Sequence, residues 1–195
     1  MASAAPPHGD DRCLLDQFAV VVYVPAPLGP YLDAIRRRAA PWLPPGRSHV
    51  SVVPPRPLNG NDPTVWRELR RRFEACRRFD AEATEVGVFE SSRVVYLEIG
   101  EGADRLRQLH EMANRGPWTF QDPYPYHPHI TLAQQVPEER FAETLERVKA
   151  LWGRYRGPRR FPVDKLHFVQ NSVVNLWADL DAVELAAGGH SKSLI

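Results

Sequence analysis

Two stretches of four residues, His-Val-Ser-Val at 49–52 and His-Ile-Thr-Leu at 129–132, each place a histidine and a hydroxyl residue two positions apart. Valine, isoleucine and threonine favour an extended backbone, and the side chains of a strand point alternately to its two faces. Each stretch therefore predicts a strand with its imidazole and hydroxyl on one face. Two such strands side by side would offer two proton-transfer groups and two hydrogen-bond donors, which is what cleaving a phosphodiester without a metal requires.

Two copies of this four-residue pattern in one chain are unlikely to arise by chance. The chain contains seven histidines, and 43% of its residues are hydrophobic. With that composition, two such tetrads arise by chance in fewer than roughly one chain in a hundred. One copy alone would carry little weight, whereas a pair within two convincing strands indicates a shared site.

The pair of tetrads resembles the signature of the two-histidine (2H) phosphoesterase superfamily, which includes the 2′-5′ RNA ligases and the RNA 2′,3′-cyclic phosphodiesterases. Further segments are similar to family segments and follow in family order: Val-Gly-Val-Phe at 86–89, the residues around the second tetrad at 128–133, and Phe-Pro-Val-Asp at 161–164. One departure is Ser51, where threonine is the commoner residue. Serine keeps the hydroxyl and loses only the stiffness of a β-branched side chain.

The resemblance implies a metal-independent reaction that opens a 2′,3′-cyclic phosphate to a 2′-phosphate, with 2′-5′ RNA ligation as a related activity and no cofactor. It implies that His49 and His129 serve as the general base and the general acid, since histidine can fill either role near neutral pH. It also implies that Ser51 and Thr131 donate hydrogen bonds to the non-bridging phosphate oxygens. Which histidine is the base stays open.

Four further residues are candidates for substrate binding. His127 and Arg47 each lie two positions before a tetrad histidine, so each shares that histidine's face if the strand begins early. Tyr124 and Tyr126 lie in the loop that leads to the second tetrad, where a ring could stack on a nucleobase. An arginine in solvent and a loop packed on the protein's own surface are equally good interpretations. The other histidines receive no role: His8, His110, His167 and His190.

The order of the expected elements predicts an α+β fold with a loose internal duplication. We expect one bilobal domain over 12–187, built from two pseudo-symmetric antiparallel-sheet lobes with outer helices and a central cleft that holds both tetrads. The ends, 1–11 and 188–195, are typical of flexible tails. The strands are expected at 17–24, 49–53, 82–89, 93–99, 129–133, 161–169 and 173–180, and the helices at 30–42, 63–79, 104–115 and from Pro137 onward.

The composition restricts the partners. Lys and Arg number 25 against 24 Asp and Glu, so tight coating of duplex nucleic acid is not expected and any RNA contact must be local. Three basic runs, 36–38, 70–72 and 154–160, could supply that contact or could be solvated faces. Cys13 and Cys76 form neither a metal motif nor a disulfide framework, and no secretory signal or membrane span is evident. We therefore expect a cytoplasmic protein that acts on RNA ends or small cyclic-phosphate nucleotides, with no membrane contact and no obligate protein partner.

Two alternatives remain open. A non-catalytic RNA- or nucleotide-binding module could keep the same fold, although such a protein has no need of a matched acid and base. A metal hydrolase could use His127 and His129 together with His49, but no acidic residue forms a ligand motif with these histidines. Within the favoured class, RNA ends, cyclic nucleotides and ADP-ribose cyclic phosphate all present the same phosphate ring, so the sequence does not choose the substrate.

Overall fold

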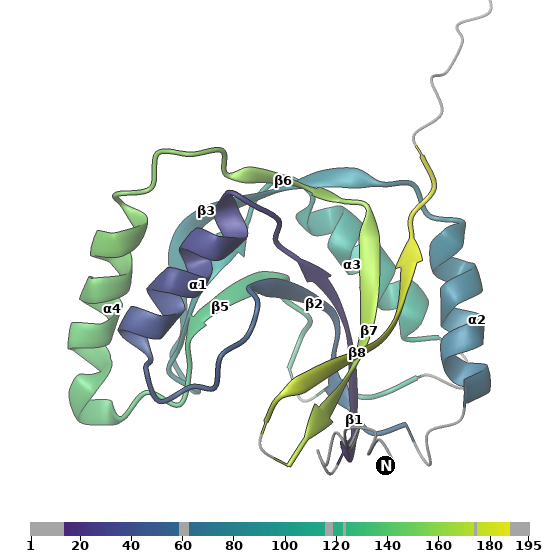
Figure 1. The fold of residues 1–195 in the computed structure, drawn as a ribbon, viewed down its shortest axis with the longest axis horizontal. Coiled ribbons are helices and arrows are strands. Elements are labelled where there is room, and N and C mark those ends of the chain that lie inside the picture. Colours follow the sequence, from purple (N-terminus) through teal and green to yellow (C-terminus); the bar gives the residue numbers. More distant parts are fainter. Residues whose placement is uncertain (1–13, 59–62, 116–118, 123, 174, 188–195) are drawn as a thin grey trace, which may run out of the picture.

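The computed structural model describes residues 14–58, 63–115, 119–122, 124–173 and 175–187, and the two tails expected at the ends lie outside these ranges. Eight strands form one antiparallel sheet in the order β6-β3-β4-β5-β2-β1-β7-β8, with four helices against it (Figure 1). The expected α+β class is confirmed. The elements are β1 Leu14–Tyr23, α1 Leu28–Ala39, β2 His49–Arg56, α2 Pro63–Glu74, β3 Phe79–Phe89, β4 Val94–Ile99, α3 Ala103–Ala113, β5 His129–Ala133, α4 Glu138–Trp152, β6 Arg160–Val163, β7 Lys165–Ser172 and β8 Trp177–Glu184.

The internal duplication appears as a symmetric strand order. The tetrad strands β2 and β5 lie at the centre of the sheet and pair with each other at Val50 and Ile130. Outward from β2 come β1, β7 and β8, and outward from β5 come β4, β3 and β6. The two expected lobes are therefore two halves of one continuous sheet, joined where the tetrads meet.

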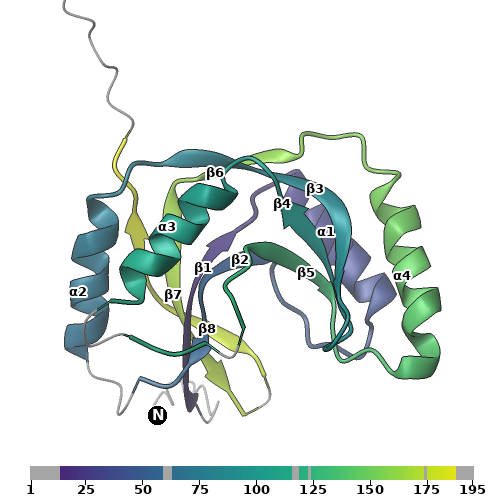
Figure 2. The same ribbon diagram turned by 180° about the vertical axis from the view of Figure 1, so that it is seen from behind.

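The helices are exchanged between the two halves. Helix α1 follows β1 in the chain but packs against β5 and α4, whereas α3 follows β4 but packs against β2 and α2. Figures 1 and 2 show the resulting pairs, α1 with α4 at one end of the molecule and α2 with α3 at the other. Each half of the sheet is thus covered by one helix of its own and one from the other half.

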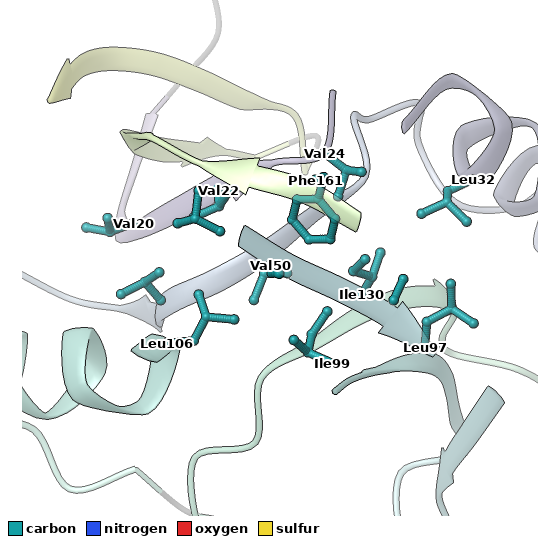
Figure 3. Packing of buried hydrophobic residues seen from close by; sticks show 14 of the residues in the cluster. Val20, Val22, Val24, Leu32, Val50, Leu97, Ile99, Leu106, Ile130 and Phe161 are labelled. Atoms are coloured by element: carbon teal, nitrogen blue, oxygen red, sulfur yellow. The ribbon is translucent and has the colours of Figure 1, made fainter. Parts of the chain in front are cut away.

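The core lies between the sheet and these helices. The aliphatic residues of the tetrads, Val50, Val52, Ile130 and Leu132, are wholly buried there. Figure 3 shows Val50 and Ile130 in the middle of the cluster, with Leu32 and Leu106 among the side chains around them. Burying each such side chain contributes roughly 1.5–3 kcal/mol. The apolar positions therefore fix the face of each strand, and the histidines and hydroxyls are left to face the other way.

The boundaries of some elements differ from those expected. The helix expected at 63–79 ends at Glu74, because Phe79 begins β3 and pairs with Val163 of β6. The strand expected at 161–169 is two strands separated by Asp164, since β6 pairs with β3 while β7 pairs with β1. The strand expected at 173–180 lies at Trp177–Glu184. In each case the partner strand, which local sequence does not reveal, sets the boundary.

The described helices include none that is both long and apolar enough to cross a membrane.

Candidate active site

Both tetrad histidines are held in the same way. The Nδ1 atom of His49 lies 2.8 Å from the carbonyl oxygen of Arg47, and Nδ1 of His129 lies 2.7 Å from the carbonyl oxygen of His127. A carbonyl can only accept, so Nδ1 carries the proton in both rings. The neutral form of each ring then leaves Nε2 as an unprotonated acceptor. The pairing of β2 with β5 thus brings together two imidazoles of the same tautomer.

One cavity of about 1140 Å³ is lined by both histidines and both hydroxyl residues, Ser51 and Thr131. Its volume is slightly above that of typical small-molecule pockets, which run to roughly 1,000 Å³. The four residues that the sequence predicts to act together are therefore brought to one site. The remaining volume is large enough for groups beyond a single phosphate ring.

The surroundings of the two histidines favour their neutral forms. Burial lowers the pKa of His49 below its ordinary value, and the carbonyl of Arg47 opposes this while the charge of Arg36 adds to it. Burial likewise lowers the pKa of His129, again opposed by a carbonyl, that of His127. Both shifts favour the neutral ring at pH 7. A bound phosphate anion would act in the opposite direction and favour the imidazolium.

Arg47 also lines this cavity and is fixed by two neighbours. Its guanidinium forms an ion pair with Asp179 of β8 at 2.5 Å and lies over the ring of Tyr23, 3.4 Å from its centroid. The hydroxyl of Tyr23 donates to the same carboxylate at 2.6 Å. A tyrosine, a carboxylate and a cation therefore form a connected group beside His49.

His127 belongs to a matching group on the other side of the cavity. Its Nε2 lies 2.7 Å from Glu98 of β4, and the same carboxylate accepts a hydrogen bond from the hydroxyl of Tyr96 at 3.0 Å. The side chain two residues before each catalytic candidate thus meets a carboxylate that also accepts a hydrogen bond from a tyrosine. The two groups differ in the side chain that meets the carboxylate, because one uses the guanidinium of Arg47 and the other the imidazole of His127.

The two tyrosines of the loop lie in different surroundings. Tyr124 is 69% exposed and lines the cavity. The ring of Tyr126 stacks on His110, with centroids 4.0 Å apart and planes within 3°. The Tyr126 hydroxyl donates to the carbonyl oxygen of Ser51 at 2.9 Å. One face of Tyr126 is thus covered, and its polar end holds the backbone of β2.

The loop that carries Tyr126 is attached to β2 by further contacts. Arg56, at the end of β2, binds both carboxylate oxygens of Asp122 at 3.0 and 3.1 Å and also reaches Asn114 at 2.9 Å. His110 lies 2.9 Å from the carbonyl oxygen of Val52 through Nδ1. The sequence assigned no role to His110, because nothing in its local spacing connects it to a loop sixteen residues away.

Sequence reasoning missed several residues in and around the cavity. Glu98 and Asp179 anchor His127 and Arg47, but only strand pairing brings them there. Of the three basic runs, the first contributes Arg36 to the cavity, and the other two contribute none of the described lining residues. Within the described ranges, no three histidine, cysteine or acidic side chains converge as metal ligands, so the metal-hydrolase alternative has no ligand set there.

A family comparison decides the classification. The model of the 2′-5′ RNA ligase superfamily matches residues 24–175, which include both tetrads and most of the sheet. The chain belongs to this superfamily. The resemblance inferred from the tetrads and the 86–89 and 161–164 segments is thereby confirmed.

A curated relative and several solved structures are also similar to the chain. A candidate phosphoesterase of Geobacillus kaustophilus is 20% identical over 146 residues, which cover 68% of this chain and 78% of that protein. LigT of Escherichia coli, solved with phosphate, has a TM-score of 0.59 at 16% identity over 87% of this chain and 97% of LigT. TT0787 of Thermus thermophilus has a TM-score of 0.60 at 18% identity over 89% of this chain and all of TT0787. LigT has also been solved with 3′-AMP. At these identities, the likeness to the solved structures establishes the fold.

Proposed function

We propose that the protein is a metal-independent phosphodiesterase that opens the 2′,3′-cyclic phosphates of RNA ends or nucleotides to 2′-phosphates. One observation carries the proposal. Two imidazoles of the same tautomer, each with Nδ1 bonded to a backbone carbonyl, line one cavity together with two hydroxyls. Membership of the superfamily and the binding of phosphate and 3′-AMP by LigT support a small phosphate ester as substrate.

The reaction follows from these groups. The neutral imidazole takes a proton from water at Nε2, the water oxygen bonds to phosphorus, and the bond from phosphorus to the ribose 3′ oxygen breaks. The protonated imidazole gives its proton to that leaving oxygen, so the products are a 2′-phosphate and a free 3′ hydroxyl. Ser51 and Thr131 donate to the non-bridging oxygens, whose negative charge increases in the transition state. His49 and His129 fill the two proton-transfer roles.

Ligation uses the same groups with a different nucleophile. If the 5′ hydroxyl of a second RNA end takes the place of water, the same displacement forms a 2′-5′ linkage and frees the 3′ hydroxyl. The proton transfers are unchanged, because one histidine still deprotonates the nucleophile and the other still protonates the leaving oxygen. The balance between the two outcomes depends on whether water or the second RNA end reaches the phosphorus.

The test is turnover of a panel of 2′,3′-cyclic mononucleotides and short RNAs ending in that group, with product position read by phosphorus NMR. We expect 2′-phosphates, a rate unchanged by excess chelator, and loss of activity in His49→Ala and His129→Ala. Lys165→Ala is the control, since Lys165 pairs with Glu184 on the surface of the same sheet and does not line the cavity. Binding without turnover would favour the non-catalytic module, and rescue of a chelated enzyme by a divalent ion would refute the metal-free reaction.

A further inference from the structure

One charged side chain in the lining of the cavity has no counterion. Among the described residues that line the cavity, those with a full charge at neutral pH are Arg36, Arg47, Asp122 and Asp179. Arg47 and Asp179 pair with each other at 2.5 Å, and Asp122 pairs with Arg56 at 3.0 Å. Arg36 is partly buried and forms no ion pair with any described residue. A desolvated charge without a counterion costs free energy, and a bound anion would offset that cost.

The guanidinium of Arg36 is fixed in position but only partly used. Its Nη1 donates to the carbonyl oxygen of Gly46 at 3.1 Å. Its Nε is buried without an acceptor, and its Nη2 donates to none of the described residues. An added Cβ at Gly46 would lie 3.7 Å from Nη1 and 3.9 Å from Nη2, so the glycine leaves that side of the guanidinium uncovered. Because Arg36 lines the cavity, Nη2 is the donor that a ligand can reach.

The acid beside Arg36 on α1 serves another purpose. Oδ1 of Asp33 accepts hydrogen bonds from the backbone nitrogen of Ser48 at 2.7 Å and from its hydroxyl at 2.6 Å. Burial lowers the pKa of Arg36 below its ordinary value, and the charge of Asp33 opposes this only in part. Helix α1 therefore holds the loop that leads to β2 at Gly46 and Ser48, and a net positive charge is left at this end of the cavity (Figure 1).

Arg36 is not placed symmetrically between the two histidines. After burial, which is the main cause, the charge of Arg36 contributes to the lowered pKa of His49. The charges that act on His129 are instead those of His127 and Glu98. Arg36 therefore lies beside His49, to one side of the line that joins the two rings. A phosphate between the rings would face both of them, so the anion that meets Arg36 is a different group.

We propose that Arg36 binds a second phosphate of the substrate, outside the cyclic phosphate that lies between His49 and His129. The inference rests on the proposed function and narrows its substrate to compounds with a further phosphate. A 5′-phosphorylated nucleotide carries it as a monoester, and an RNA end carries it as the phosphodiester at the 5′ oxygen of the last ribose. Charge-assisted hydrogen bonds from a guanidinium to phosphate oxygens are among the strong ones. Arg47 is less suited to this role, because Asp179 already compensates its charge.

The test compares three substrates that share the cyclic phosphate and differ at the 5′ oxygen. They are adenosine 2′,3′-cyclic phosphate with a free 5′ hydroxyl, the same compound with a 5′-phosphate, and the dinucleotide ApA ending in a 2′,3′-cyclic phosphate. We expect the wild type to prefer a substrate with the further phosphate by about ten- to a hundredfold in kcat/KM, the range given by hydrogen bonds to a charged group. If Arg36 determines the preference for the monoester alone, the ligand is a nucleotide, and if it also determines that for the dinucleotide, the ligand is an RNA end.

The variants test the ratio of kcat/KM between substrates with and without the further phosphate. Arg36→Gln removes the charge and should bring this ratio close to one. Any effect of the change on His49 cancels in the ratio, because all three substrates use the same histidines. Arg37→Gln is the matched control, since Arg37 is exposed on the same helix and does not line the cavity, and it should keep the wild-type ratio. Arg36→Lys keeps the charge but loses the planar fork, so its ratio should be intermediate.

Calorimetry gives a second readout that needs no turnover. Arg36→Gln should weaken the binding of adenosine 2′,5′-bisphosphate more than that of adenosine 2′-phosphate, by a factor similar to the lost ratio. Thermal melts identify a misfolded variant, and Arg36→Lys then decides. A wild-type ratio near one, an unchanged ratio in folded Arg36→Gln, or an equal loss in Arg37→Gln would overturn the inference. Absence of turnover on every substrate would instead refute the proposed function, while calorimetry would still test Arg36.

Discussion

Each proposed catalytic histidine donates a hydrogen bond from Nδ1 to the carbonyl two residues before it in the chain. The other ring nitrogen, Nε2, is therefore the one that can act on the substrate. We expect His49→Ala and His129→Ala each to lower kcat by roughly two to four powers of ten, the usual contribution of a positioned acid or base. The double variant should be little slower than either single one, because the two rings act as a unit. Steady-state kinetics on a cyclic mononucleotide measures this. If His127→Ala abolished activity while His129→Ala kept the wild-type kcat, the catalytic role would belong to His127 and not to His129.

The hydroxyl residues should matter less than the imidazoles. Each donates one hydrogen bond to a developing oxyanion, so Ser51→Ala and Thr131→Ala should lower kcat by roughly tenfold to a thousandfold. Ser51→Thr keeps the hydroxyl and adds a β-branch, so it should retain activity. If both alanine variants change only KM, the hydroxyls bind the ground state and the transition state equally, contrary to the proposed role.

The pH dependence follows from the lowered pKa of both histidines. The profile of kcat/KM reports the free enzyme, in which one ring must be neutral and the other protonated. Because burial lowers both pKa values below about 6.5, the optimum of kcat/KM should lie on the acidic side of 6.5. The phosphate in the complex favours the imidazolium, so the kcat profile should be displaced to higher pH. A kcat/KM profile at the same or higher pH than that of kcat would contradict this account.

At the scale of the elements, the loop before β5 acts on β2 through the Tyr126 hydroxyl. Tyr126→Phe removes that one hydrogen bond and keeps the stacking on His110, so we expect kcat to fall about two- to tenfold. Because Tyr126 acts through the backbone of Ser51, its effect should shrink once the serine hydroxyl is gone. The measurement is a double-mutant cycle of Tyr126→Phe with Ser51→Ala. Fully additive effects in kcat would show that Tyr126 does not position Ser51.

The elements also show where sequence reasoning is sufficient. The strands β2 and β5 were predictable because alternation of apolar and polar residues specifies both the strand and its buried face. The break at Asp164 was not predictable, because residues 161–169 are rich in β-branched and aromatic side chains and resemble a single strand. Only their partners separate the two strands, since β6 pairs with β3 and β7 pairs with β1. The roles of Glu98 and Asp179 were not predictable for the same reason. Their positions beside the site depend on the register between strands that are far apart in the chain.

At the scale of the whole molecule, four partly or fully buried histidines have lowered pKa values: His49, His110, His129 and His167. These histidines therefore bind protons more tightly in the unfolded chain than in the folded one. Stability is therefore fully present above pH 6.5 and is lost as the pH falls from there toward the folded pKa values, with a slope of up to about 1.4 kcal/mol per pH unit for each group. Urea unfolding at pH 7.5 and 5.5 should show the loss.

His129→Ala supplies the control for that measurement. It removes one of the four groups, so its free energy of unfolding should fall less than that of the wild type over the same pH interval. Carboxylates such as Asp181, whose pKa is lowered from 3.8, titrate below this window and do not interfere. A wild type that gains stability on acidification to pH 5.5 would show that these histidines are not held neutral.

The exchange of α1 and α3 between the halves was beyond sequence analysis, although the duplication itself was visible in the order of elements. At Asp164 the chain also passes from one half of the sheet to the other, because β6 pairs with β3 and β7 pairs with β1. These connections restrict how the two halves can move relative to each other. The tetrad strands meet at Val50 and Ile130, a seam that could act as a hinge. Turning about that hinge would pull α1 from β5, α3 from β2 and β6 from β3 at once. The two halves are therefore tied to each other at three places besides the seam, and we expect the cavity to keep its width when a ligand binds.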